Sequence, residues 1–157
     1  MVLLSVLLPL ALQASAQDSS TPEERAQWIQ VKRSLEGSPL DADVDRQGEA
    51  ALNRLMAVHD IHVPLCQALF NEFRSMKYAY AHAITRQYMI ASAVFMIENP
   101  DKASDTNAMN LAAVESTLKS YQAILQQKPD AKAKSLEDLL KKQSQGKLPD
   151  ALQKQCR

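Results

Sequence analysis

The stretch MAVHDIHVPLC places three metal-binding side chain types close together, at Met56, His59 and His62, and ends at Cys66. Imidazole, thioether and thiolate groups all bind transition metals, and spacings of three or four residues put side chains on one face of a helix. Pro64 interrupts such a helix before the cysteine. We therefore expect a histidine-containing turn between helices and no cofactor, with Met56, His59 and His62 kept as alternative metal ligands.

Cys66 and Cys156 are the two cysteines of the chain. Two cysteines in an oxidising compartment usually pair, so we predict a disulfide between them. It would join the last residues of the chain to the start of a long central helix and stabilise the fold by roughly 4–5 kcal/mol on chain-entropy grounds. The Cys-x-x-Cys-His haem motif is absent, which excludes a c-type cytochrome bundle.

Tyr78, His82 and Arg86 are spaced four residues apart and lie opposite the main apolar stripe of the predicted central helix. The arginine offers a planar fork to an anionic group, and the histidine adds a second, titratable group. These three residues form our candidate face for a ligand or partner. The alternative is a solvated face with no binding role.

Other motifs that would indicate an enzyme or a metal protein fail. The acids Asp41, Asp43 and Asp45 alternate like the start of a calcium loop, but Arg46 and Leu52 occupy the positions that need Gly and Glu. No nucleophile elbow, phosphate loop or zinc-protease helix occurs. We therefore expect a binding protein rather than an enzyme.

The N-terminal residues predict export. Residues 2–12, VLLSVLLPLAL, form an apolar run too short to span a bilayer, and Ala14-Ser15-Ala16 is a pattern that signal peptidase accepts. We predict a signal peptide over 1–16, a periplasmic or secreted protein, and no stable membrane span after cleavage. No Lys or Arg precedes the apolar run, so an uncleaved N-terminal anchor is the alternative.

Composition predicts one helical domain over 17–157, because Gly and Pro are few and good helix formers are plentiful. The net charge of +0 argues against nucleic acid as a partner. The charge is uneven, at −4 over 17–63 and +4 over 128–157, counting Asp and Glu against Lys and Arg. These two parts either pack against each other or leave the molecule dipolar.

Helix signals recur along the whole chain. Thr21-Pro22-Glu23-Glu24 is a capping box with proline at the first helical position. The segment from 64 to 98 lacks internal Gly and Pro and carries an apolar stripe at helical spacing, and its second half is apolar almost all round. We predict an all-α, up-and-down bundle of about five helices around one long central helix, about 64–98. The other helices are expected over about 22–37, 41–59, 104–128 and 130–145.

These features favour a non-enzymatic module that binds another macromolecule, such as an immunity-like protein or an adaptor that contacts another protein of the cell envelope. Its contact surface would be the acidic N-terminal third or the Tyr78–Arg86 face. The second hypothesis is a small-ligand or metal-binding bundle, and the weakest is a hydrolase without a recognisable motif.

Overall fold

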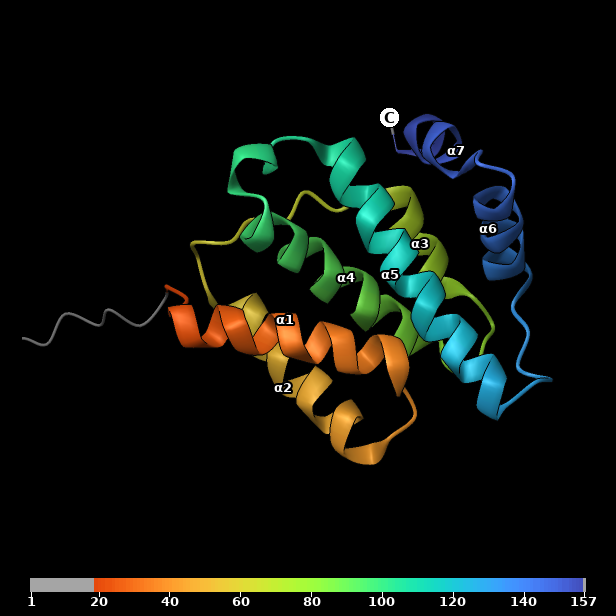
Figure 1. The fold of residues 1–157 in the computed structure, drawn as a ribbon, viewed down its shortest axis with the longest axis horizontal. Coiled ribbons are helices and arrows are strands. Elements are labelled where there is room, and N and C mark those ends of the chain that lie inside the picture. Colours follow the sequence, from red (N-terminus) through yellow and green to blue (C-terminus); the bar gives the residue numbers. More distant parts are fainter. Residues whose placement is uncertain (1–18, 157) are drawn as a thin grey trace, which may run out of the picture.

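The computed structural model describes residues 19–156, and the predicted signal peptide lies outside this range. Residues 19–156 form seven α-helices and one short 3-10 helix, joined by loops, and contain no strand. The predicted all-α bundle is therefore confirmed (Figure 1). Its elements are α1 (Pro22–Gly37), α2 (Ala42–Ala57), α3 (Gln67–Ser75), α4 (Ala81–Glu98), η1 (Pro100–Lys102), α5 (Thr106–Gln127), α6 (Lys134–Ser144) and α7 (Leu148–Gln155).

Local capping sets the start of the first two helices. The Thr21 hydroxyl accepts from the Glu24 N–H, and the Glu24 carboxylate accepts from the Thr21 N–H, which is the predicted capping box. The Asp41 carboxylate accepts from the N–H groups of Asp43 and Val44. The acids at the start of α2 therefore satisfy the helix terminus.

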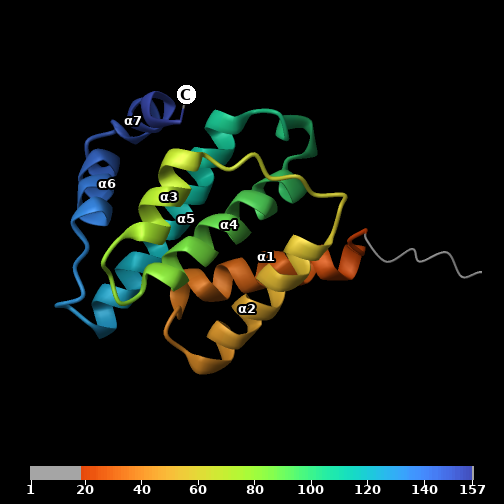
Figure 2. The same cartoon turned by 180° about the vertical axis from the view of Figure 1, so that it is seen from behind.

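Helix α4 is the centre of the molecule and packs against α1, α2, α3 and α5 (Figures 1 and 2). Its two sides belong to two different apolar clusters. Ile84 and Tyr88 lie in the cluster shared with α3, α5, α6 and α7, whereas Ile90 and Val94 lie in the one shared with α1 and α2. The apolar composition all round this segment is explained by burial on both sides.

The predicted single helix over 64–98 is wrong in one respect, because the chain leaves the helical path at 76–80. No Gly or Pro marks this break. In one straight helix Phe73 and Tyr88 would lie about four turns apart and could not touch. The break folds α3 back beside α4, so that the two rings meet with centroids 5.5 Å apart. Tyr78 packs at the break against Tyr80 and Tyr121, at 5.5 and 6.2 Å between ring centroids. Tertiary packing of aromatic side chains thus outweighs the local helical tendency.

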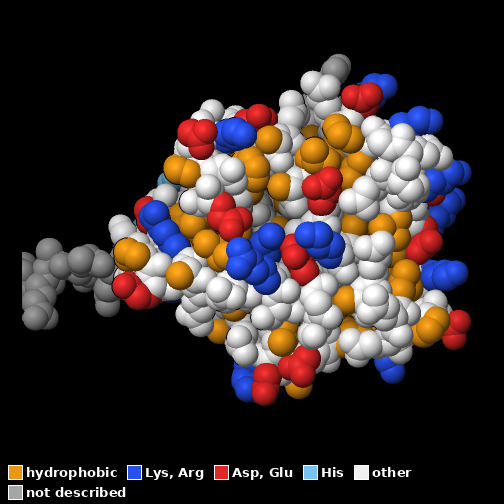
Figure 3. Space-filling model, viewed as in Figure 1, with side chains coloured by type: hydrophobic (Ala, Val, Ile, Leu, Met, Phe, Trp, Pro, Cys, Tyr) orange, Lys and Arg blue, Asp and Glu red, His pale blue; other side chains and the backbone are white. Residues whose placement is uncertain are grey.

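The two oppositely charged parts of the sequence lie at different ends of the bundle. Helices α6 and α7 pack against α5, and α2 packs against α1 and α4 (Figure 1). Lys and Arg side chains gather along the edge that α6 forms (Figure 3). No ion pair between described residues joins 19–63 to 128–156, which favours the dipolar alternative. Within 19–156, no helix combines the length and apolarity that a membrane crossing needs.

Candidate functional site

An open groove of about 370 Å³ lies between the end of α2, the chain that follows it, and α4. Figure 2 shows these three elements side by side. Met56 on its wall is 68% exposed and is the one large hydrophobic side chain exposed among residues 19–156. None of the described residues that line the groove is Asp, Glu, Lys or Arg. Its lining residues are Leu55, Met56, Val58, His59, Ile61, His62, Val63, Leu65 and Met89.

The floor of the groove is an extended segment over 58–66. Helix α2 ends where Val58 adopts an extended conformation, with φ −84° and ψ 149°. Burial then alternates along the chain, since Ile61, Val63 and Leu65 are half-buried and the residues between them are exposed. This period of two is typical of an extended chain with one buried face. Apolar residues alternate in the same way in the sequence, at Ile61, Val63 and Leu65, and this pattern indicates an extended segment. We had predicted only a turn between helices here.

Both ends of this extended segment are held in place. Near its start, the Asp60 carboxylate accepts from the Ser20 N–H and hydroxyl at 2.8 and 2.7 Å, and from Arg25 at 2.7 Å. Desolvation raises the pKa of Asp60, but these hydrogen bonds more than offset it and hold the pKa far below its ordinary value. At its end, the Cys66 N–H donates to the Tyr88 hydroxyl at 3.2 Å. These contacts therefore fix the floor of the groove.

The predicted metal ligands Met56, His59 and His62 all line this one groove. They do not share a helical face, because α2 ends at Ala57 and the two histidines belong to the extended segment. Among residues 19–156, no group of three or more His, Cys, Asp or Glu side chains is placed to hold a metal ion. Cys66 is committed to a disulfide.

The predicted face of Tyr78, His82 and Arg86 is not formed. Tyr78 precedes α4 and His82 is exposed, whereas the side chain of Arg86 is 0% exposed. Helix α2 covers the arginine and supplies its counter-charges, Glu49 and Asp45. Because α2 packs against α4, Arg86 faces α2 instead of solvent.

Arg86 forms a small polar cluster with the residues of α2. Its Nη1 donates to the Glu49 carboxylate and lies 2.8 Å from Oδ1 of Asp45. His82 Nε2 lies 2.6 Å from the same Glu49 oxygen. Desolvation raises the pKa of Glu49, but the bonds to His82 and Arg86 outweigh it, so the pKa lies below its ordinary value. The carboxylates of Asp45 and Glu49 thus compensate the charge of the buried Arg86.

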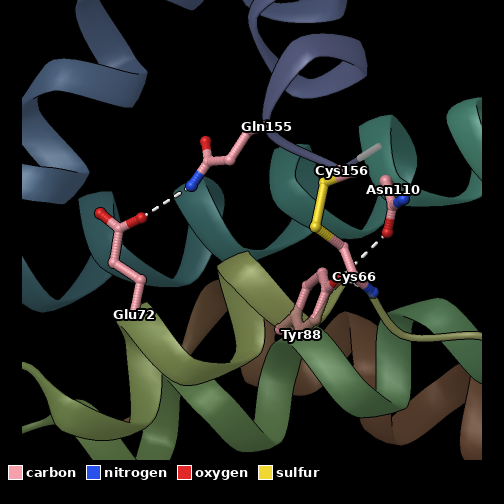
Figure 4. The surroundings of a disulfide bond; sticks show 6 residues. All are labelled: Cys66, Glu72, Tyr88, Asn110, Gln155 and Cys156. Atoms are coloured by element: carbon pink, nitrogen blue, oxygen red, sulfur yellow. Dashed lines mark hydrogen bonds between the residues drawn. A yellow bond between two sulfur atoms is a disulfide. The ribbon is translucent and has the colours of Figure 1, made fainter.

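The predicted disulfide between Cys66 and Cys156 is present, with 5.2 Å between the Cα atoms (Figure 4). It joins the residue before α3 to the residue after α7. Behind it, the Tyr88 hydroxyl donates to Oδ1 of Asn110 at 2.9 Å. Burial raises the pKa of Tyr88 to about 12, so this hydroxyl keeps its proton at neutral pH.

Comparison with known proteins gives no relative for this chain. No protein-family model, no curated protein sequence and no solved structure matches it.

Proposed function

We propose that this is an exported, non-enzymatic module that binds another protein of the cell envelope through the groove beside Met56. The observation that carries the proposal is the apolar lining of this groove, on which Met56 is exposed and in which no described Asp, Glu, Lys or Arg lies. Exposed apolar surface costs solvation free energy, and large patches of it often mark interaction sites. The disulfide is compatible with an exported protein.

The shape of the groove favours a polypeptide partner over a small molecule. Small-molecule sites usually bury most of the ligand surface inside a concave cavity. This groove is partly open to solvent, so a small ligand would stay partly solvated. Apolar side chains projecting from a partner chain fit such a surface better. Met56 and Met89 add flexible, polarisable side chains that adapt to the partner.

The backbone of the extended segment supports the same conclusion. Among the described residues, the backbone groups of Ile61, His62 and Val63 form one bond to another backbone group, which the Val63 carbonyl accepts from the Leu65 N–H. An extended partner segment could pair with the groups that remain, as in other cases of strand addition. Main-chain pairing would give affinity, and the apolar groove would select the side chains.

The test is a charge placed on the groove wall. Met56→Glu should weaken capture of the partner from an envelope extract at least about tenfold, because a carboxylate would have to be desolvated against apolar side chains. The matched control is Asn53→Glu, which adds the same charge to an exposed position of α2. Partner capture that is equal for wild type and both variants, measured by quantitative mass spectrometry, would exclude the groove as the contact.

A second candidate function is metal binding, because Met56, His59 and His62 line the same groove. Thioether and imidazole ligands suit soft or borderline ions such as Cu⁺. Titration with Cu⁺ or Zn²⁺ alone, followed by calorimetry, separates the two functions. Tight binding that is lost in His59→Ala and His62→Ala would favour the metal site over the protein contact.

A further inference from the structure

A second, smaller pocket lies beside the groove, on the other side of Leu65. It has a volume of about 280 Å³ and lies between the start of α3, the first turns of α5 and the end of α7. Leu65 lines both the groove and this pocket, so the two are adjacent. The described residues that line the pocket are all uncharged: Pro64, Leu65, Cys66, Gln67, Ala68, Thr106, Asn110, Gln155 and Cys156.

Backbone donors of α3 border this pocket. The first N–H groups of a helix have no acceptor within the helix and need another partner. In α3 the N-cap residue is Cys66, whose sulfur is in the disulfide, and no side chain caps the helix. The N–H groups of Gln67 and Ala68 therefore remain for solvent or a ligand. The positive end of the helix dipole adds to the attraction for an anion.

Asn110 is the second and independent indication of a ligand. Its side chain belongs to a residue that is 3% exposed, yet it lines the pocket. Its oxygen accepts from Tyr88, and no described residue accepts from its amide nitrogen. Because Asn110 lines the pocket, this nitrogen is not fully enclosed by protein atoms. An amide donor that lacks a protein acceptor and reaches the pocket is left for water or for an acceptor on a ligand.

The orientation of this amide follows from the hydrogen-bond chain behind the disulfide. The Cys66 N–H can only donate, so the Tyr88 oxygen accepts from it and the Tyr88 hydrogen must go elsewhere. It goes to Asn110, which must present its carbonyl oxygen to Tyr88. Figure 4 shows the Asn110 nitrogen turned away from Tyr88. The pocket is therefore offered a pair of N–H donors and not a carbonyl group.

We propose that the polypeptide which occupies the groove ends in this pocket, with its C-terminal carboxylate bound by Asn110 and the N–H groups of Gln67 and Ala68. This inference rests on the proposed function and specifies its partner as a free C-terminus preceded by apolar residues. Oxyanions match the donors on this wall, and none of the described lining residues carries a carboxylate. None of these described residues carries a cationic side chain either, so the carboxylate alone would bind weakly and the groove must supply most of the affinity.

The experiment uses a pool of N-acetyl tetrapeptides that end in Leu, Ile, Val or Phe, prepared as free acids and as C-terminal amides. The probe is the exported protein with its disulfide intact, observed by NMR at the methionine methyl groups and backbone amides. Both pools should shift the methyl signals of Met56 and Met89. The free acids should also shift the amide signals of Gln67 and Ala68, and bind at least about tenfold more tightly than the amides.

The matched variants are Asn110→Asp and Asn107→Asp. The first keeps an acceptor for Tyr88 but replaces the donor with a carboxylate, so binding of the acids should fall at least about tenfold. The second adds the same charge at an exposed position one turn earlier in α5 and should change binding less than about twofold. The wild-type comparison of acids with amides does not depend on the folding of either variant.

Two failures are distinguishable. Acids and amides that bind equally, with shifts at Met56 but none at Gln67 or Ala68, would overturn the carboxylate site and leave the groove as the contact. Absence of methionine shifts with both pools at millimolar concentration would contradict the proposed function itself.

Discussion

Arg86 was predicted to lie on a face that binds a ligand or partner, but its side chain is buried against α2. A buried guanidinium needs compensation, and Glu49 and Asp45 of α2 provide it. Two of its nitrogens, Nε and Nη2, are nevertheless buried without a partner among the described residues. The arginine lies directly against Gly48, because α2 passes so close to α4. Glycine is a poor helix former, but at this position the packing against Arg86 requires it.

Gly48→Ala should destabilise the protein by about 1–3 kcal/mol. A Cβ atom there would lie 2.8 Å from Nε and 3.1 Å from Cζ of Arg86, and the ion pairs hold the guanidinium in place. The resulting displacement outweighs the gain of about 1 kcal/mol in helix propensity. The measurement is the free energy of unfolding in urea.

The control for this substitution is Gly37→Ala at the end of α1. Nothing lies within 4 Å of the added Cβ atom, so this variant should be neutral or more stable by up to about 1 kcal/mol. Equal effects of the two substitutions would show that Arg86 moves aside freely.

At the level of the elements, the start of α6 depends on a hydrogen bond from a side chain of the neighbouring helix α5. It follows an extended connection, and its N-cap residue Ala133 offers no capping side chain. Tyr121 of α5 compensates by accepting from the Ala133 N–H at 3.0 Å and donating to the Glu137 carboxylate at 2.6 Å. The start of α6 is thus fixed by a hydroxyl from another helix.

Tyr121→Phe should destabilise the protein by about 1–3 kcal/mol, because it leaves the buried Ala133 N–H without an acceptor. Hydrogen exchange at the start of α6 should quicken. Tyr78→Phe in the same aromatic cluster is the control, since the buried Tyr78 hydroxyl has no partner among the described residues. Removing that hydroxyl should cost nothing and could stabilise the fold slightly. An equal loss in both variants would place the effect in ring packing instead of hydrogen bonding.

At the scale of the whole molecule, the disulfide joins parts of the chain 90 residues apart. It holds α7 against the start of α3, and a hydrogen bond of 2.8 Å between Gln155 and Glu72 supports the same contact. This junction also forms the pocket beside Asn110. Loss of the disulfide should therefore affect both stability and the proposed binding of a carboxylate.

Replacing Cys66 and Cys156 together with Ala should lower the free energy of unfolding by roughly 4–5 kcal/mol, since a long loop is no longer closed in the unfolded chain. Urea unfolding of the oxidised protein and the double variant gives this difference. The wild type unfolded in dithiothreitol should match the double variant. A loss below about 1 kcal/mol would mean that the packing of α7 alone holds this end of the bundle.

Four features were predictable from the sequence alone: the helical class, the capping box of α1, the burial of the segment after Arg86, and the cysteine pair. Each of these depends on local pattern or on a small number of chemical options. It also contained the alternation at Ile61, Val63 and Leu65, although that short signal is easily taken for part of a turn.

Three features could not be predicted from the sequence: the break at 76–80, the burial of Arg86 and the placement of Asn110. These depend on contacts between residues far apart in the chain: Tyr78 with Tyr121, Gly48 with Arg86, and Cys66 with Tyr88. A helical stripe shows which positions can be buried, but not which neighbour covers them. In this protein α2 covers Arg86, which was predicted to lie on a binding face. The end of α2 leaves the proposed groove beside Met56 exposed.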